Sequence, residues 1–264
     1  MQKKSIVVKI GGSTLGNKDT TLEDLVELQK QGKPLVVVHG GAKVTSEWLA
    51  RLGISTTFIN GLRVTDAETL KVVAAALGGL VNKELVVAIQ ALGGKAVGLS
   101  GCDGSLLWAT IKSPELGYVG EIVTVDPTPL KLLLEAGYMP VVAPISFGSV
   151  GSKTMLLNVN GDAAAGEIAA ALAAEKLVFL TDVDSIHDES GKMIPRLNLA
   201  EAKEMIASGT ATGGMIPKIE ASLKSLTTVP IVRIIDGRMS HALLNVIASE
   251  TKQSQLGGTT IVPE

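Results

Sequence analysis

Apolar residues in this chain fall into short unbroken runs, separated by longer segments in which apolar residues recur at helical spacing. The runs predict strands that are buried on both faces, because their apolar positions are continuous rather than alternating. They cover residues 5–10, 35–39, 96–99, 139–144, 177–181, 231–235 and 259–262. Repeated strand–helix–strand order predicts an α/β fold, a three-layer αβα sandwich with a mainly parallel central sheet.

Capping and terminating residues set the limits of the helices between these strands. Thr21 is expected to N-cap a helix that has Asp24 at its N3 position and ends at Gly32. Thr65 and Glu68 predict a capping box for a long alanine-rich helix that runs to about residue 92. Further helices are expected at residues 44–52, 127–136, 161–174, 199–208, 215–226 and 240–249.

Residues 103–126 interrupt this alternation. Glycine and proline punctuate short β-prone pieces there, as in Asp103-Gly104 and Ser113-Pro114, so we expect one or two β-hairpins. No low-complexity tract or long linker divides the chain. We place a lobe boundary near residue 175, at a helix-to-strand junction, which gives an N-terminal lobe of residues 1–175 and a C-terminal lobe of residues 176–264.

Composition narrows the class of protein. The 264 residues are 46% hydrophobic, which suffices for one large α/β domain or two lobes. The net charge is −2 and no basic stripe occurs, which argues against nucleic acid as a partner. Cys102 is the only cysteine, so neither an intramolecular disulfide nor a cysteine zinc site is possible, and a reducing cytoplasm is expected. Lys9 interrupts the first apolar run too early for a signal peptide, and the stretch 168–174 is too short to span a bilayer.

Two lysines lie in glycine-rich turns at opposite ends of the chain. Lys9 closes an apolar strand before Gly11 and Gly12, and Lys218 follows Gly213-Gly214 near the start of a predicted helix. Two cations with nearby backbone N–H groups suit an anionic group held between them. Phosphoryl transfer needs this arrangement, because its catalysis consists mostly of positioning and charge neutralisation.

The common phosphate-binding signatures are absent. The sequence has no Gly-x-x-x-x-Gly-Lys-[Ser/Thr], so it is not a P-loop protein. No two glycines lie two positions apart, which excludes the Gly-x-Gly-x-x-Gly dinucleotide fingerprint. Neither His-Arg-Asp nor Asp-Phe-Gly occurs, so the protein-kinase signatures are missing too. No His, Cys or carboxylate group shows metal-ligand spacing, and we expect no metal ligands from the protein.

Six short segments do match one known pattern, in order and over nearly the whole chain. They are residues 8–12 (VKIGG), 38–41 (VHGG), 61–66 (GLRVTD), 157–162 (LNVNGD), 180–183 (LTDV) and 213–218 (GGMIPK). With these segments the chain resembles the amino acid kinase family, and within it the branch that phosphorylates N-acetyl-L-glutamate. The resemblance implies the amino acid kinase, or carbamate kinase-like, fold.

The resemblance also implies a reaction. ATP would phosphorylate the side-chain carboxylate of N-acetyl-L-glutamate in arginine biosynthesis, with Mg²⁺ carried on the ATP phosphates. The N-terminal lobe would hold the acyl amino acid and the C-terminal lobe would hold ATP. This chemistry is consistent with the residues, because a carboxylate is already ionised at neutral pH and needs no general base. The obstacle is repulsion between two anions, which the two lysines relieve.

Individual roles follow from the same resemblance. Lys9 and Lys218 would contact the transferring phosphoryl group, and Asp162 would lie between them and orient them. Arg63 would bind a substrate carboxylate and Asn158 the substrate, while backbone N–H groups of Gly11, Gly12, Gly40 and Gly41 would serve phosphate and substrate. The adenine nucleotide would be surrounded by Thr181, Asp182, Val183, Asp184, Ser185, Ile186, Thr210, Ala211 and Thr212. His39 is interpreted as a hydrogen-bonded packing residue rather than a base.

Two departures from the family pattern bear on these expectations. Ala42 and Lys43 follow the glycine pair where many relatives carry a third glycine and a proline, and alanine takes a positive φ less cheaply than glycine. Only eight residues precede Lys9, whereas arginine-inhibited relatives carry an extra N-terminal helix that interlocks dimers into hexamers. We therefore expect a homodimer that is insensitive to arginine, with the long helix 66–92 either at the dimer seam or sealing the core.

Two other functions stay open at this stage. One is a kinase of the same fold that acts on α-aminoadipate or glutamate attached to a carrier protein, because Lys43 and the hairpins at 103–126 could widen the site. The other is a catalytically inactive amino-acid or nucleotide sensor. Retention of Lys9, Asp162 and Lys218 together argues against the sensor.

Overall fold

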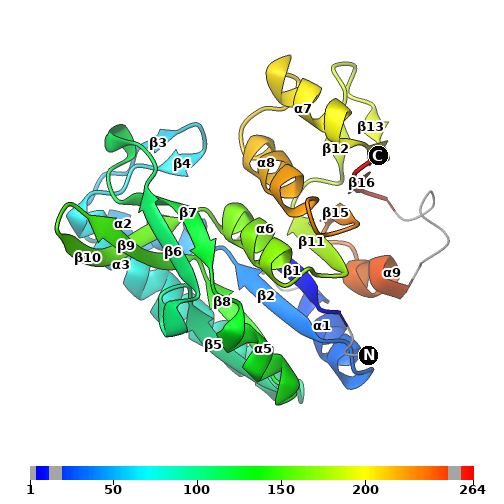
Figure 1. The fold of residues 1–264 in the computed structure, drawn as a ribbon, viewed down its shortest axis with the longest axis horizontal. Helices are drawn as coiled ribbons and strands as arrows, with labels where there is room; N and C mark the ends of the chain where they lie inside the picture. Colours follow the sequence, from blue (N-terminus) through cyan, green and yellow to red (C-terminus); the bar gives the residue numbers. More distant parts are fainter. Residues whose placement is uncertain (1–3, 12–19, 249–256) are drawn as a thin grey trace.

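The structure is a computed structural model that describes residues 4–11, 20–248 and 257–264 (Figure 1). Its centre is an eight-stranded sheet in which neighbouring strands are parallel, except where β15 and β16 pair antiparallel. In spatial order the strands are β14 (Arg196–Leu197), β16 (Thr259–Ile261), β15 (Val232–Asp236), β11 (Lys176–Thr181), β1 (Ile6–Ile10), β2 (Leu35–His39), β8 (Met139–Ala143) and β5 (Ala96–Ser100). The mainly parallel sheet is confirmed.

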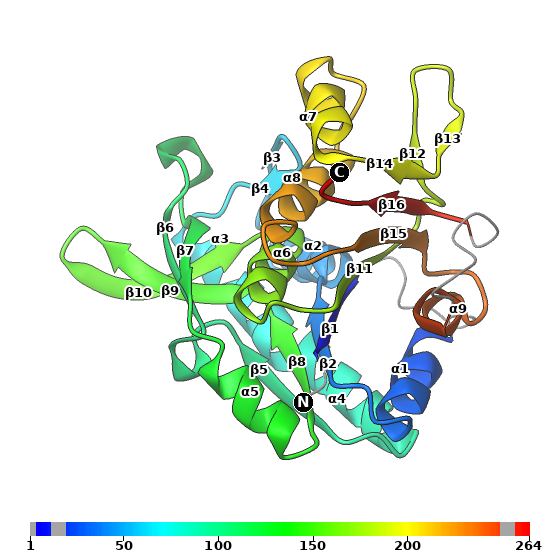
Figure 2. The ribbon, with the colours of Figure 1, turned by 45° about the vertical axis from the view of Figure 1, so that its right-hand side comes forward.

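Helices cover both faces of this sheet, which confirms the three-layer sandwich. One face packs against α1 (Thr21–Lys30), α4 (Asn82–Ala91) and α9 (Ala242–Ala248). The other packs against α5 (Thr128–Glu135), α6 (Gly161–Ala171) and α8 (Met215–Ser225), with α7 (Leu199–Ala207) lying on α8. Figure 2 shows α1 and α9 side by side. Successive side chains of β1 point to opposite faces of the sheet. Val8 packs in the core on the α1 side and Val7 in the core on the α6 side, so the Lys9 side chain lies on the α6 side.

Four further strands close into a small barrel beside the sheet. They are β6 (Leu107–Ile111), β7 (Val119–Val125), β9 (Ile145–Val150) and β10 (Lys153–Val159). The antiparallel pair β6–β7 confirms the hairpin expected at residues 103–126. Short 3₁₀ turns, Asp103–Ser105 and Pro114–Leu116, flank β6. Two-residue strands form the hairpins β3 (Phe58–Ile59) with β4 (Leu62–Arg63) and β12 (Ile186–His187) with β13 (Met193–Ile194).

The long helix predicted to reach residue 92 has three parts. They are α3 (Ala67–Ala74), a π-helical segment (Ala75–Val81) and α4. This helix is long and apolar enough to cross a membrane by length and composition alone. Here it packs as a core helix, with Val81, Leu85 and Ile89 against the sheet. A shorter helix, α2 (Ala42–Arg51), follows β2.

Two predicted helix starts are wrong by one residue. The N-cap of α3 is Asp66, whose side chain accepts a hydrogen bond from the Thr69 N–H at 2.8 Å, whereas Thr65 is buried. Thr20, not Thr21, precedes α1, and no side chain caps that helix. Asp24 is instead buried against His241. In both cases two residues of types that often cap helices are adjacent, so the sequence pattern does not decide which residue begins the helix.

Candidate active site

The site lies where strands of the central sheet end. Lys9 is the penultimate residue of β1. The first turn of α6, whose N-cap is Asn160, lies next to it. The Asn160 side-chain oxygen accepts hydrogen bonds from the N–H groups of Asp162 at 2.8 Å and Ala163 at 3.0 Å. This cap fixes Asp162 in the first turn of α6, where the helix dipole favours a carboxylate.

Asp162 joins the two lysines that the sequence singled out. Lys9 Nζ lies 2.9 Å from Asp162 Oδ1, and Lys218 Nζ, from the first turns of α8, donates a hydrogen bond to Oδ2 at 3.2 Å. The side chains are 10%, 7% and 14% exposed for Lys9, Asp162 and Lys218. Burial opposes ionisation of the carboxyl, but the two ammonium groups outweigh it and hold the pKa of Asp162 below its usual range. The triad is therefore a buried set of two cations and one anion.

A cavity of about 190 Å³ opens on the Lys9 side of this triad. It contains every described residue that the sequence assigned to the acyl substrate. Its lining includes Lys9, Gly40, Gly41, Arg63, Asn158 and Asp162, together with the apolar side chains of Phe58, Leu62, Val73, Leu77, Val119, Pro144 and Val159. A small cavity with one polar and one apolar side suits a short acylated amino acid.

Arg63 is held rigidly at the wall of this cavity. Its Nη2 donates to the Ala42 carbonyl at 3.1 Å and to Ser46 Oγ at 2.7 Å, and the guanidinium lies 4.7 Å from the centre of the Phe58 ring. Burial lowers the pKa of Arg63, although an arginine stays cationic. Nη1 is buried without a hydrogen-bond partner in the described part of the chain. An unpaired buried donor of this kind needs an anionic or carbonyl partner.

The glycine turn after β2 differs in one respect from expectation. The N–H groups of Gly11 and Gly40 were expected to serve phosphate or substrate. They instead donate to the carbonyls of Leu180 and Ile10 at 3.1 and 2.9 Å, because both residues extend the hydrogen bonding of the parallel strands. Gly41 lies at the helix N-cap position of α2 with φ 157°. Ala42 begins α2 and needs no positive φ, so its substitution for glycine leaves the turn intact. Gly12 lies outside the described residues.

A larger cavity, of about 720 Å³, opens on the Lys218 side. All nine residues from Thr181 to Ile186 and Thr210 to Thr212 that were assigned to the nucleotide line it. The sequence reasoning assigned five others to no nucleotide contact: His187, Met205, Gly214, Met215 and Arg238. Arg238 carried a usable signal, because it lies two residues after the carboxyl end of a strand, where α/β proteins bind ligands. It binds Asp236 through two hydrogen bonds, at 2.9 and 2.8 Å.

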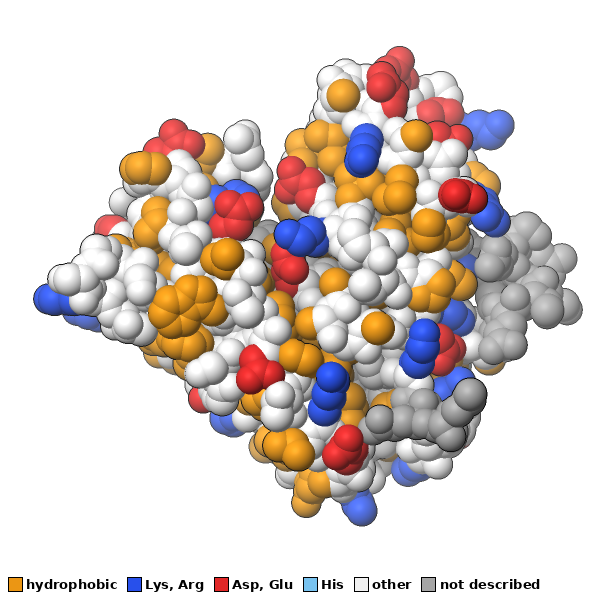
Figure 3. All heavy atoms as spheres, in the orientation of Figure 1, with side chains coloured by type: hydrophobic (Ala, Val, Ile, Leu, Met, Phe, Trp, Pro, Cys, Tyr) orange, Lys and Arg blue, Asp and Glu red, His pale blue; other side chains and the backbone are white. Residues whose placement is uncertain are grey.

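An open cleft of about 710 Å³ lies between the hairpins and helices α6 and α8. Figure 3 shows the surface hollowed between these two parts of the molecule. The cleft shares Leu62, Val119 and Asn160 with the small cavity, so the two lie next to each other.

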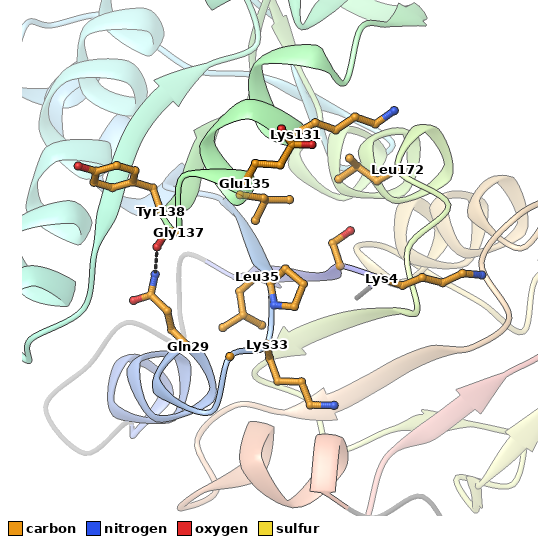
Figure 4. A pocket seen from close by; sticks show the side chains of 13 residues that line it. Lys4, Gln29, Lys33, Leu35, Lys131, Glu135, Gly137, Tyr138 and Leu172 are labelled. Carbon is orange, nitrogen blue, oxygen red and sulfur yellow. Dashed lines mark hydrogen bonds between the residues drawn. The ribbon is translucent and has the colours of Figure 1, made fainter. Parts of the chain in front are cut away.

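A fourth cavity, of about 560 Å³, lies at the opposite ends of the strands (Figure 4). Ser5 and Leu35, at the starts of β1 and β2, line it. Gln29 reaches across to the Gly137 carbonyl at 3.3 Å. It shares no residue with the cavities around the triad, so we do not assign it to the same chemistry.

In the described part of the chain, His39 is not available as a base and no protein metal centre is found. His39 is fully buried, and that burial lowers its pKa to about 4, which keeps the ring neutral at physiological pH. Among the described residues no group of three or more His, Cys, Asp or Glu could hold a metal ion. The site therefore offers fixed charge and hydrogen-bond donors.

Known proteins match this chain over most of its length. The amino acid kinase family model matches residues 4–236. Acetylglutamate kinase of Dehalococcoides mccartyi (strain CBDB1) is 47% identical over 243 residues, which cover 90% of this chain and 89% of the relative. The crystal structure of smu.665 from Streptococcus mutans has a TM-score of 0.84 at 29% identity, and all of both chains is covered. Carbamate kinase from Giardia lamblia, with a TM-score of 0.69 at 14% identity and 98% of each chain covered, shares the fold. The resemblance read from the six motifs is confirmed, and the chain belongs to the amino acid kinase family.

Proposed function

We propose that this protein transfers the γ-phosphoryl group of ATP to the side-chain carboxylate of N-acetyl-L-glutamate, giving N-acetyl-L-glutamyl 5-phosphate for arginine biosynthesis. One observation carries the proposal. Lys9 and Asp162 line the small cavity, Lys218 lines the large one, and Asp162 contacts both lysines. The triad thus joins the linings of the two cavities, as expected if a group passes from one to the other. The relatives named acetylglutamate kinase identify the reaction class.

The residues act by neutralising charge rather than by moving a proton. An oxygen of the substrate carboxylate forms a bond to the γ-phosphorus, and the bond from that phosphorus to the bridging oxygen of ADP breaks. Lys9 faces the acceptor side and Lys218 the leaving-group side, so the growing charge meets an ammonium group at each end. Asp162 keeps both lysines in place. Mg²⁺ on the ATP phosphates supplies further positive charge to the same groups.

At the acceptor end, Arg63 and Asn158 hold the substrate. The unpaired Arg63 Nη1 would donate to the α-carboxylate, while Nη2 stays on Ala42 and Ser46. Asn158 donates to Thr65 Oγ1 at 3.1 Å, which leaves its side-chain oxygen as an acceptor for the substrate N–H. The apolar wall with Leu77 and Val119 would receive the acetyl methyl group.

The large cavity suits the nucleotide. Its lining combines apolar side chains such as Met205 and Met215 with the cations Lys218 and Arg238. That combination fits a flat base at one end and phosphates at the other. We assign ATP to this cavity, and with it the division into an acyl amino acid lobe of residues 1–175 and an ATP lobe of residues 176–264. The lobe boundary remains a proposal.

A homodimer would use the helix of residues 67–91. The helix leaves Val87 64% exposed, and β5, beside it, is the last strand of the sheet order. An exposed apolar side chain next to an open strand edge favours pairing with a second copy. The homodimer, its insensitivity to arginine and the cytoplasmic location stay predictions.

The open cleft beside the small cavity favours one alternative function. Because the small cavity borders the cleft at Leu62, Val119 and Asn160, a longer substrate attached to a carrier protein would reach Lys9 if these side chains let it pass. No observation supports the alternative of a catalytically inactive sensor, because binding an amino acid or nucleotide does not require the two buried lysines on Asp162.

Turnover with trapping of the product separates these functions. The protein is incubated with ATP, Mg²⁺ and either N-acetyl-L-glutamate or L-glutamate, and hydroxylamine converts an acyl phosphate to its hydroxamate. Hydroxamate from the acetylated substrate alone supports the proposal. Product only with carrier-linked α-aminoadipate or glutamate would favour the alternative kinase, and nucleotide binding without any product would favour the sensor.

A further inference from the structure

A buried polar pair lies behind the glycine turn, outside the triad and outside the lining of both cavities. His39 is the last residue of β2 and Asn82 the first of α4, and both side chains are fully buried. Buried polar side chains are costly unless they are hydrogen-bonded, so their partners indicate what they hold.

The partners of Asn82 fix which way its amide points. Its Nδ2 contacts the carbonyls of Val141 at 2.8 Å and Leu99 at 3.3 Å, and its Oδ1 accepts from Lys83 Nζ at 2.9 Å. Nδ2 therefore also faces His39, 3.1 Å from Nε2, and its two hydrogens are shared among these three acceptors. Asn82 thus ties α4 to the strands β2, β5 and β8.

This arrangement also fixes the tautomer of His39. Nδ1 faces a carbonyl, which can only accept, and Nε2 faces an amide NH2 group, which can only donate, so the ring proton of the neutral imidazole is on Nδ1. Nδ1 lies 2.7 Å from the Gly40 carbonyl and donates to it. The carbonyl of the Gly40–Gly41 peptide is therefore held on the buried side of the turn.

The orientation of that carbonyl determines the orientation of an N–H group. The peptide is trans, so its N–H, on Gly41, points opposite to the Gly40 carbonyl. Gly41 lines the small cavity, and its N–H donates no hydrogen bond to the described residues. Leu77, from the π-helical segment just before Asn82, leaves no room behind Gly41: a Cβ there would come 2.5 Å from Leu77 Cδ2.

We propose that His39 and Asn82 are positioning residues that lock the Gly40–Gly41 peptide with its Gly41 N–H directed at the reacting carboxylate and phosphoryl group. The inference rests on the proposed function. It assigns the buried pair a role in transition-state stabilisation through Gly41, without contact to either substrate. A donor held in place before reaction stabilises developing charge more than one that must rotate into position.

Isosteric substitutions of His39 separate this role from simple packing. In His39→Asn the amide nitrogen replaces Nδ1 and can still donate to the Gly40 carbonyl. In His39→Gln it replaces Nε2 and cannot. We expect His39→Asn to keep kcat within about tenfold of the wild-type protein and His39→Gln to lower kcat about a hundredfold, the usual loss for one oriented N–H donor. The KM for ATP should not change, and His241→Gln, a half-exposed histidine on the α1–α9 side, is the matched control.

Nitrogen-15 NMR of the wild-type imidazoles tests the geometry without any assay. His39 should show a protonated Nδ1 and an unprotonated Nε2, unchanged between pH 5.5 and 8. The opposite tautomer would overturn the inference even if the substituted proteins fail to fold, and so would equal kcat values for folded His39→Asn and His39→Gln. If the wild-type protein forms no acyl phosphate, the proposed function fails instead, and the tautomer still decides whether the turn is locked.

Discussion

Lys9 Nζ and Asp162 Oδ1 lie 2.9 Å apart although the lysine belongs to β1 and the aspartate to α6, 153 positions later in the sequence (162 − 9). The Asn160 cap presents the carboxylate, and the alternation of β1 turns the lysine toward it. Two lysines share this one carboxylate, so the site has an excess positive charge that is ready for an anion.

Removal of the shared carboxylate should damage both activity and stability. Asp162→Asn leaves two buried ammonium groups without a counter-charge, and breaking a buried ion pair from one side typically costs about 3–5 kcal/mol. We expect kcat to fall at least a hundredfold and the free energy of unfolding to drop by several kcal/mol. Urea unfolding and turnover measure the two effects. Asp126→Asn, at an exposed turn, should change neither by much.

Arg63→Lys tests the substrate end. A lysine cannot hold Ala42 and Ser46 and also present a second donor, because it lacks the planar fork of arginine. Loss of a charge-assisted hydrogen bond costs about 1.5–3 kcal/mol, so the KM for N-acetyl-L-glutamate should rise about tenfold to a hundredfold. The KM for ATP should stay near its wild-type value. Arg51→Lys, on an exposed position of α2, is the control, and an unchanged acceptor KM in Arg63→Lys would remove Arg63 from the substrate site.

Burial of neutral His39 predicts a pH dependence of stability. The pKa of His39 is lowered from 6.5 to about 4 by burial, with smaller contributions from nearby cations. Below pH 6.5 the unfolded chain takes up a proton that the folded chain excludes until about pH 4. The free energy of unfolding should therefore fall as the pH drops from 6.5 to 4, by about 3 kcal/mol in total.

Chemical denaturation of the wild-type protein and of His39→Asn over this range isolates the effect. The variant lacks the titrating ring, so its stability should be less sensitive to pH than that of the wild-type protein. Parallel curves for the two proteins would contradict the assignment of the acid sensitivity to His39.

The exposed side of the helix 67–91 predicts where a second copy binds. Val87→Asp places a charge on this face, where Val87 is 64% exposed, and should shift the mass in solution from dimer to monomer. Analytical ultracentrifugation measures the change. Leu132→Asp, at a 60% exposed position on α5, is the matched control and should leave the mass unaltered. A dimer that withstands Val87→Asp would place the seam elsewhere.

The sequence predicted most of the central sheet because its strands are buried on both faces. Continuous runs such as residues 35–39 have few other interpretations, and β2 has these bounds. The barrel strands β9 and β10 were missed; β10 is mostly exposed in its first four residues, and its polar residues weaken the apolar signal. The π-helical segment at Ala75–Val81 was missed as well, because a helical apolar pattern does not distinguish it from an α-helix.

At the site, the two glycine-flanked lysines indicated Lys9 and Lys218 when they were considered together, and the family motifs supplied Asp162, Arg63 and Asn158. The pairing of His39 with Asn82 was not predictable. The two residues are 43 positions apart, one at the end of β2 and the other within the long helix of residues 67–91, so no local sequence pattern predicts their contact. The same holds for the use of the Gly11 and Gly40 N–H groups within the sheet, which depends on strand register.

The central claim is that Lys9 neutralises charge on the phosphoryl group as it passes to the acceptor carboxylate. Hydroxamate formation from N-acetyl-L-glutamate, ATP and Mg²⁺ by Lys9→Ala, beside wild-type protein and Lys33→Ala from the far end of the sheet, tests it most directly. We predict product from the wild-type protein and Lys33→Ala, and a loss of at least a hundredfold in Lys9→Ala with ATP binding retained. Near wild-type turnover by folded Lys9→Ala would contradict the account.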